Sequence, residues 1–105
     1  MESPRVTVRW EDDGTAVVVC GGEFDLDTVG ALARACEGEA TAAELLVLDV
    51  TGVAFADSTF LNELLRLRRS RLVVLAGPLP SQLRRMLEMT GALTLFEVRD
   101  DAATT

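Results

Sequence analysis

The first part of the chain contains two stretches whose polar and apolar residues follow strand patterns. Residues 5–10, Arg-Val-Thr-Val-Arg-Trp, alternate polar and apolar side chains, which predicts a strand with one solvated face. Residues 15–20 are almost continuously apolar and predict a more central strand that ends at Gly21-Gly22. The Asp13-Gly14 step between them is typical of a hairpin turn. The chain is therefore expected to start with an antiparallel hairpin.

Three later apolar runs also predict strands. Residues 45–50 form the most strand-like run, and their near-continuous apolarity favours a strand that is covered on both faces. We expect this strand to give way to a loop at Thr51-Gly52. Residues 72–76 and 93–98 predict two further short strands, the first of them closed by Gly77-Pro78.

Helical spacing of apolar side chains predicts three helices between these strands. Asp25 or Asp27 is expected to cap the first helix, and Gly38 to end it. Ser81 is expected to cap the third helix and Gly91 to stop it. The three predicted stripes are Val29, Leu32, Ala33 and Cys36; Leu61, Leu64, Leu65 and Arg68; and Leu83, Met86, Leu87 and Thr90.

The elements therefore follow the order β-β-α-β-α-β-α-β. Strands that alternate with helices predict a mixed, mostly parallel sheet in an α/β fold. The 105 residues suffice for one hydrophobic core, so residues 1–105 are expected to form a single domain. Residues 100–105 are expected to be a frayed polar tail.

The composition limits the catalytic and binding chemistry that the chain can perform. The chain contains no His, Lys or Tyr, and all ten basic residues are Arg, which cannot serve as a general base. The usual partners that activate a serine are therefore missing, and neither a metal nor another cofactor is expected. A net charge of −7 argues against nucleic acid, and no apolar run is long enough for membrane insertion. Cys20 and Cys36 indicate small buried hydrophobic residues in a reducing cytoplasm.

The tripeptide Asp57-Ser58-Thr59 stands where the second helix is expected to begin. These side chains all accept hydrogen bonds from free N–H groups, so one of them is expected to cap the helix. A serine at a helix N-terminus is also a candidate phosphoacceptor, because free N–H groups and the helix dipole favour an added dianion. Such a modification would change a binding surface without unfolding the helix.

Two other segments have both a structural and a functional interpretation. Residues 22–28, Gly-Glu-Phe-Asp-Leu-Asp-Thr, are a cap-rich loop at the carboxyl end of a strand, where open α/β sheets often place binding surfaces. Arg66, Arg68, Arg69 and Arg71 match the dipole at the end of the second helix and leave open a contact with an acidic partner.

These segments resemble a known family. Gly22-Glu23-Phe24-Asp25, with Thr28, is similar to the G-E-(L/F)-D loop of bacterial STAS domains, and residues 46–59 are similar to their strand, loop and D-S-(S/T) step. The third helix, which ends in Thr90-Gly91, is also similar. The subgroup that the chain resembles most is the anti-sigma factor antagonists.

The resemblance implies a regulatory domain and not an enzyme. It implies a sheet covered by helices on one face, with both loops at one end of the domain. Its expected partner is an anti-sigma factor that is also a serine kinase of the ATPase type. Ser58 would be the phosphoacceptor and Thr59 a secondary one, while Asp25, Asp57 and Thr28 would contribute to the partner-binding surface.

The sequence departs from the family at two positions. Phe60 and Asn62 replace the glycines of the family's G-L-G. Phe60 is interpreted as an exposed anchor for a different partner or as a residue that blocks a kinase, and Asn62 as a further contact. This departure keeps an alternative open, in which the chain is a phosphorylation-independent adaptor subunit of a transport or signalling complex. Catalysis through Asp57 and Asp25 is the least favoured hypothesis, and homodimerisation is left open.

Overall fold

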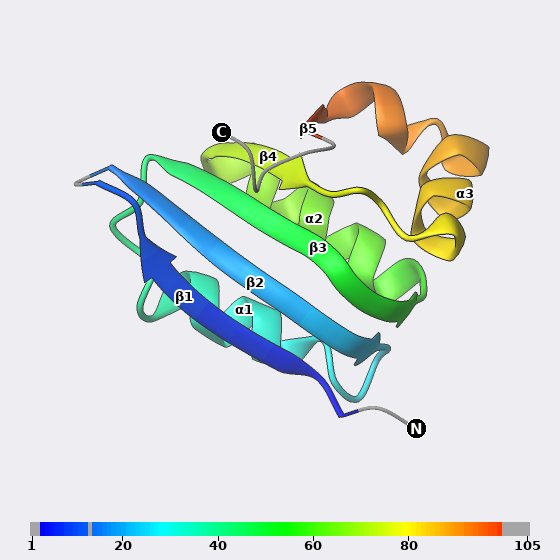
Figure 1. Ribbon diagram of the computed structural model, residues 1–105, viewed down its shortest axis with the longest axis horizontal. Coiled ribbons are helices and arrows are strands. Elements are labelled where there is room, and N and C mark those ends of the chain that lie inside the picture. Colours follow the sequence, from blue (N-terminus) through cyan, green and yellow to red (C-terminus); the bar gives the residue numbers. More distant parts are fainter. Residues whose placement is uncertain (1–2, 13, 100–105) are drawn as a thin grey trace.

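The computed structural model describes residues 3–12 and 14–99, and within them the chain forms a five-stranded sheet with three α-helices (Figure 1). The strands are β1 (Arg5–Trp10), β2 (Thr15–Phe24), β3 (Leu45–Ala56), β4 (Leu72–Ala76) and β5 (Glu97–Arg99). The helices are α1 (Gly30–Glu37), α2 (Ser58–Ser70), α3 (Ser81–Thr90) and the short 3-10 helix η1 (Ala92–Leu95). The predicted α/β fold and its element order are confirmed. Asp13 of the predicted turn and the tail at 100–105 lie outside the described residues.

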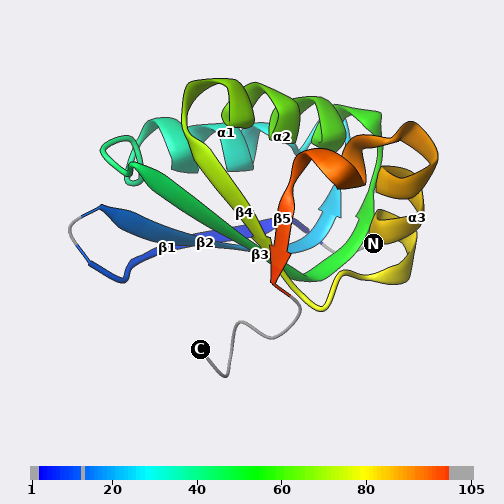
Figure 2. The same cartoon turned by 90° about the horizontal axis from the view of Figure 1, so that it is seen from above.

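The strands lie side by side in sequence order, from β1 to β5. β1 pairs with β2 antiparallel, and every later pair is parallel. Because parallel crossovers are right-handed, strands that are added in one direction place their connecting helices on one face of the sheet. Figure 2 shows α1 and α2 on that single face and α3 beside the end of β3, and buried side chains of all three helices belong to one core.

The main core fills the space between this face and the helices. Its largest fully buried side chains include Phe24, Phe60 and several leucines from the sheet and all three helices. Cys20 and Cys36 are free thiols buried in this core, as predicted. Among the helices of the described part of the chain, none combines the length and the apolar character needed to cross a membrane.

The prediction that residues 45–50 are covered on both faces is wrong. Helices cover only the face that carries Leu46, Leu48 and Val50. On the opposite face, Val47 forms a smaller apolar cluster with Val17 and Ala76 of the neighbouring strands. The apolarity of the second face thus reflects contacts between adjacent strands and not a second layer of helices.

Two predicted strand ends are also wrong, and they have one cause. β2 continues past Gly21-Gly22 to Phe24, and β3 continues past Thr51-Gly52 to Ala56. Gly21 pairs with Gly52 across the two strands, between register shifts in the β2–β3 ladder. Each glycine-containing stretch, read by itself, indicates a turn. Because the two stretches pair with each other, both strands continue through them.

The predicted last strand and two helix details need similar correction. Much of residues 93–98 belongs to η1, so β5 is only three residues long. In α2 the buried stripe contains Leu67, whereas Leu65 is only partly buried and Arg68 is exposed. Ser81 is the first residue of α3 and makes no side-chain cap, but Gly91 ends this helix in the left-handed conformation as predicted.

Candidate functional site

The two segments singled out in the sequence meet at one end of the sheet. Phe24, the last residue of β2, pairs with Ala56, the last residue of β3. The next residue, Asp57, donates its backbone N–H to the Phe24 carbonyl oxygen at 3.2 Å. The loop that leads to α1 and the start of α2 therefore begin side by side, at the carboxyl ends of two central parallel strands (Figure 1).

Asp57 caps helix α2 and sets the position of Ser58. Its backbone is extended, and its Oδ1 accepts a hydrogen bond from the Thr59 N–H at 2.9 Å. The Thr59 hydroxyl donates to the same oxygen. Ser58 is the first residue of the helix, and its side chain is exposed. The predicted cap is confirmed, and it presents one exposed hydroxyl at the positive end of the helix dipole.

Asp25 does not cap α1 as predicted, because it stabilises the loop before the helix. Its Oδ1 accepts from the backbone N–H groups of Asp27 and Thr28, at 2.9 and 3.1 Å. The Thr28 Oγ1 accepts from the Asp25 N–H at 2.9 Å and lies 3.0 Å from the Glu23 carbonyl oxygen, to which it donates. Helix α1 starts only at Gly30 and has no side-chain cap.

The interpretation of Phe60 as an exposed anchor is wrong. Its side chain is 0% exposed, and its ring centroid lies 5.0 Å from that of Phe24. Phe60 lies in the first turn of α2, which packs directly on the end of β2, so the ring points into the core. Asn62, the other residue that replaces a family glycine, is exposed.

Gln82 is a residue of this end that the sequence did not reveal. Its side-chain amide Nε2 donates to the Ala56 carbonyl oxygen at 2.8 Å, and its Oε1 accepts from the Ala56 N–H at 2.9 Å. Helix α3 is thereby tied to the last residue of β3, immediately before Asp57. The two residues are 26 positions apart, and no local pattern marks the pair.

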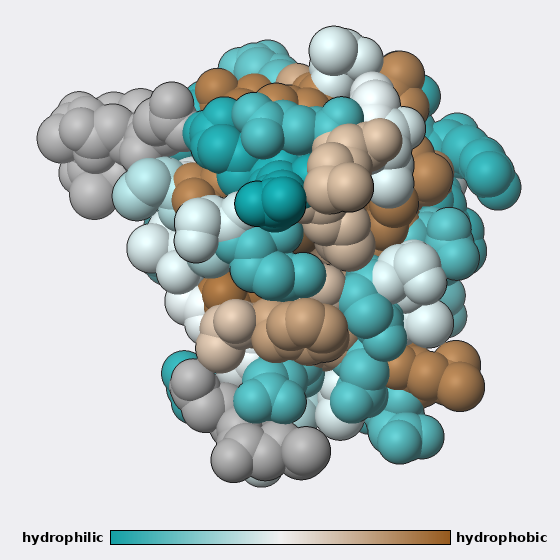
Figure 3. Space-filling view, turned by 90° about the vertical axis from the view of Figure 1, so that its right-hand side faces the viewer, coloured by the Kyte–Doolittle hydropathy of each residue, from teal (hydrophilic) through white to brown (hydrophobic). Residues whose placement is uncertain are grey.

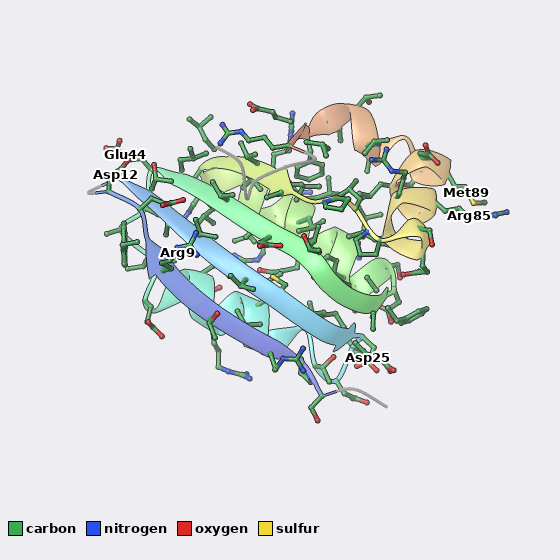
Figure 4. The ribbon with its side chains drawn as sticks, in the orientation of Figure 1. Arg9, Asp12, Asp25, Glu44, Arg85 and Met89 are labelled. Atoms are coloured by element: carbon green, nitrogen blue, oxygen red, sulfur yellow. The ribbon has the colours of Figure 1, made fainter. Side chains whose placement is uncertain are left out.

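Exposed apolar side chains also belong to this end. Leu26 in the loop is 76% exposed, and Phe55, one residue before the end of β3, is 43% exposed. Figure 3 views the molecule from this side and shows hydrophobic groups set among hydrophilic ones. In Figure 4, Asp25 lies at the end of β2, while Arg85 and Met89 of α3 point outward on the same side. In the sequence, the sign that Leu26 and Phe55 could belong to a binding surface is that each is an apolar residue whose immediate neighbours are polar or small.

The arrangement suits reversible protein binding better than metal chemistry. Several carboxylates lie near the helix start, yet among residues 3–12 and 14–99 no group of three or more metal-ligating side chains is placed to hold an ion. What this end offers instead is an exposed hydroxyl, a fixed neighbouring carboxylate and exposed apolar side chains.

Comparisons with known proteins agree with this architecture. The family model described as "Mlab, STAS domain" matches residues 6–97. The chain is similar to the crystal structure of an anti-sigma factor antagonist from Mycobacterium paratuberculosis, with 30% identity and a TM-score of 0.71, over 92% of this chain and 86% of that one. No curated protein matches significantly.

Two further structures share the fold at lower identity. Both are of SpoIIAA, and each covers 92% of this chain with 17% identity. The unphosphorylated form, described as an anti-sigma factor antagonist, has a TM-score of 0.74 over 90% of its own chain. The phosphorylated form, described as a Bacillus cell fate determinant, has a TM-score of 0.64 over 93% of its chain.

Proposed function

This chain belongs to the STAS domain family, in its anti-sigma factor antagonist subgroup, and we propose that it binds a kinase-type anti-sigma factor and is released when Ser58 is phosphorylated. In this proposal the protein is a cytoplasmic regulator and not an enzyme. Binding of the unmodified form would occupy the anti-sigma factor and free a sigma factor. Phosphorylation of Ser58 by the same partner would end the binding.

The observation that carries the proposal is the exposure of Ser58 at the first position of α2. Free N–H groups and the helix dipole stabilise a phosphate at this position, so the fold tolerates the modification. A phosphoserine adds about −1.5 to −2 charges. Next to the Asp57 carboxylate, this charge would repel a partner that packs on the helix start.

The surroundings of Thr59 favour Ser58 over Thr59 as the acceptor. The Thr59 hydroxyl donates to Asp57 Oδ1, inside the cap. A phosphate on Thr59 would remove this donor and place negative charge against the capping carboxylate. We therefore assign Thr59 a positioning role, as the residue that holds Asp57, rather than the secondary acceptor role that the family resemblance implies.

The proposed partner surface combines the two loops. Asp25, Asp57 and Asn62 would supply polar contacts, and Thr28 would hold the first loop in shape through its bonds to Asp25 and Glu23. Phe60 is removed from this surface because it is buried. We add Leu26 and Phe55, whose exposed apolar area would be covered by the partner. Apolar groups at the centre of an interface often carry much of its affinity.

The test compares two serines at equivalent helical positions. Ser81 is exposed at the first position of α3 and makes no side-chain cap, so Ser81→Asp is the matched control for Ser58→Asp. Both variants and wild type are used to capture partners from the native host, and captured proteins are identified by mass spectrometry. The captured kinase is then incubated with ATP and wild type, Ser58→Ala or Ser81→Ala, and phosphate is measured by intact mass.

We expect wild type and Ser81→Asp to retain a kinase-type anti-sigma factor and Ser58→Asp to lose it. Phosphate should appear on wild type and on Ser81→Ala but not on Ser58→Ala. Equal retention of that kinase by wild type and Ser58→Asp would refute the switch.

A second candidate function is the phosphorylation-independent adaptor. The observations that favour it are the family model, whose description names Mlab and not an antagonist, and the residues Phe60 and Asn62 in place of the family glycines. It predicts a stable complex with an ATPase subunit of a transporter that persists unchanged in Ser58→Asp. The same capture experiment separates the two functions by the identity of the retained partner.

A further inference from the structure

A second surface lies at the other end of the parallel strands, away from Ser58. A groove of about 540 Å³ runs along the edge of the sheet where α2 passes into β4 and η1 passes into β5. Its walls include Arg68, Arg71, Leu72, Leu95, Glu97 and Arg99. Residues 68 and 71 were singled out in the sequence as part of an arginine set, and the function proposed above makes no use of them.

Part of the groove is apolar, and part of its backbone has no strand neighbour. The side chains of Leu72 and Leu95 are 71% and 45% exposed. β5 pairs only with Val74 to Ala76 of β4, so among the described residues no strand covers the outer side of Leu72 and Val73. Edge backbone of this kind can pair with an added extended chain.

The groove also carries positive charge in a chain whose net charge is −7. Arg68 Nε donates to the Leu95 carbonyl oxygen at 2.8 Å, and Arg71 Nη1 donates to the Ala40 carbonyl oxygen at 2.9 Å. Among the described residues, neither guanidinium has a carboxylate as its partner. Glu97 is paired with Arg99 at 2.9 Å, so within residues 3–12 and 14–99 Arg68 and Arg71 have no carboxylate partner.

We propose that this groove docks an extended acidic segment of a partner protein, in which carboxylates alternate with apolar residues. The alternation follows from strand geometry, because successive side chains of an extended chain point to opposite sides. Apolar side chains would cover Leu72 and Leu95, while carboxylates would pair with Arg68 and Arg71. A second copy of the chain fits less well, because a two-fold contact would bring Arg68 and Arg71 of both copies together.

The location gives the groove a function separate from that of Ser58. Leu72 begins β4 in register with Leu45 at the start of β3, whereas Ser58 follows Ala56 at the end of β3. A segment held in the groove would leave the helix start of α2 uncovered. The domain could therefore remain attached to one protein while the state of Ser58 controls its contact with another.

The experiment uses the whole chain and two soluble fluorescent peptides of equal length. One peptide alternates leucine with glutamate and the other alternates leucine with lysine. We expect the acidic peptide to bind saturably, to bind less tightly as salt concentration rises, and to shift the amide NMR signals of Leu72, Val73 and Glu97. The basic peptide should not bind.

Variants with matched controls locate the site. Leu72→Ser and Arg68→Gln should each weaken binding of the acidic peptide about tenfold. Met89→Ser is the control for Leu72, because Met89 is similarly exposed, at 76%, and does not line the groove. Arg69→Gln is the control for Arg68, because Arg69 is the next residue on α2 and does not line the groove. Both controls should bind like wild type.

Three results would overturn the proposal. They are equal affinity for the two peptides, unchanged affinity in Leu72→Ser, and signal shifts centred on residues near Ser58. Self-association in sedimentation velocity that Leu72→Ser abolishes would also overturn it, because a second copy would then fill the groove. None of these results bears on the switch at Ser58, which is tested by a different partner and by different residues.

Discussion

The starts of α1 and α2 use the same pair of residue types in two different ways. Each follows a strand that ends beside the other, at Phe24 and Ala56, and in each an aspartate comes directly after the strand. Asp25 and Thr28 bond to each other and close a loop, and α1 begins only at Gly30. Asp57 and Thr59 also bond to each other, but here the helix begins at once with Ser58.

The spacing of the pair explains the difference. With two residues between Asp25 and Thr28, the threonine hydroxyl reaches back to the Asp25 N–H and the Glu23 carbonyl oxygen. With one residue between Asp57 and Thr59, the aspartate caps the helix. Only the second arrangement presents a serine at the first position of a helix. An aspartate and a threonine after a strand therefore do not by themselves identify a modification site, because their spacing determines what they present.

The largest effect is expected from the ring contact that joins the two regions. Phe24 ends β2, Phe60 lies in the first turn of α2, and both side chains are 0% exposed. Phe60→Ala should lower the free energy of unfolding by about 3–5 kcal/mol, because it leaves a cavity in the core. Phe55→Ala, at a side chain that is 43% exposed, is the control and should cost about 1 kcal/mol or less. Urea unfolding of both variants measures the difference, and similar losses would contradict the assigned packing.

The second prediction concerns the thiols of Cys20 on β2 and Cys36 on α1, the two elements that the Asp25 loop connects. Burial raises the pKa of Cys20, and burial also raises the pKa of Cys36 from 9.0 to about 11. The folded state therefore holds these protons more tightly than the unfolded chain does. Their contribution to stability is complete below about pH 8.5. The contribution of Cys36 is lost as the pH rises towards 11, and that of Cys20, whose pKa is raised further, continues to fall above pH 11.

Because of the composition, a change in stability in this alkaline pH range can be assigned to the thiols. The chain has no Lys and no Tyr, and Arg stays protonated, so the two thiols are the side chains that titrate there. Between pH 9 and 11 the free energy of unfolding should fall by about 1.4 kcal/mol per thiol for each pH unit. Denaturant titrations at several pH values measure the slope. Cys36→Ala should make it shallower, and a flat wild-type profile would be evidence against buried thiols.

The third prediction concerns a bond that the start of α2 has and the start of α1 lacks, the one between Gln82 and the end of β3. Gln82→Leu removes both hydrogen bonds to Ala56 and should cost about 2 kcal/mol, since it leaves a backbone donor and acceptor unpaired. Gln82→Glu keeps an acceptor for the Ala56 N–H but sets a second carboxylate oxygen against the Ala56 carbonyl oxygen, so its loss should be at least as large. Chemical unfolding gives the cost, and amide exchange at Ala56 should accelerate in Gln82→Leu. Unchanged exchange there would contradict the role of this side chain.

Local signals predicted the element order and a cap by one residue of Asp57-Ser58-Thr59 at the start of α2, because each depends on neighbouring residues. The errors arose where distant residues decide the outcome. Gly21 and Gly52 each indicate a turn alone, yet they pair across two strands. At Gly22, with φ of +90°, a side chain would come within 2.3 Å of the Ser3 carbonyl oxygen, so the glycine permits a close approach of the segment before β1 rather than ending β2.

The candidate site shows the same limit. Phe60 was interpreted from the family glycines it replaces, whereas its burial depends on Phe24, which lies on another element. Gln82 contacts a residue 26 positions away, so nothing near it in the sequence reveals its role. By contrast, the position of Ser58 at a helix start is a local feature, and the tripeptide made it a candidate phosphoacceptor before the family resemblance singled it out.

The smallest effect directly tests the comparison between the two Asp–Thr pairs. Thr28→Val should cost about 1–2 kcal/mol, because the hydroxyl both accepts from Asp25 N–H and donates to the Glu23 carbonyl oxygen. Thr59→Val should cost only about 0.5 kcal/mol, because the backbone N–H of residue 59 can still donate to the capping carboxylate. Thr28→Ser keeps the hydroxyl and should recover most of the loss. Urea unfolding ranks the three variants. If Thr59→Val proved as costly as Thr28→Val, the hydroxyl of Thr59 would be an essential part of the α2 cap, and the two pairs would be more alike than their geometry indicates.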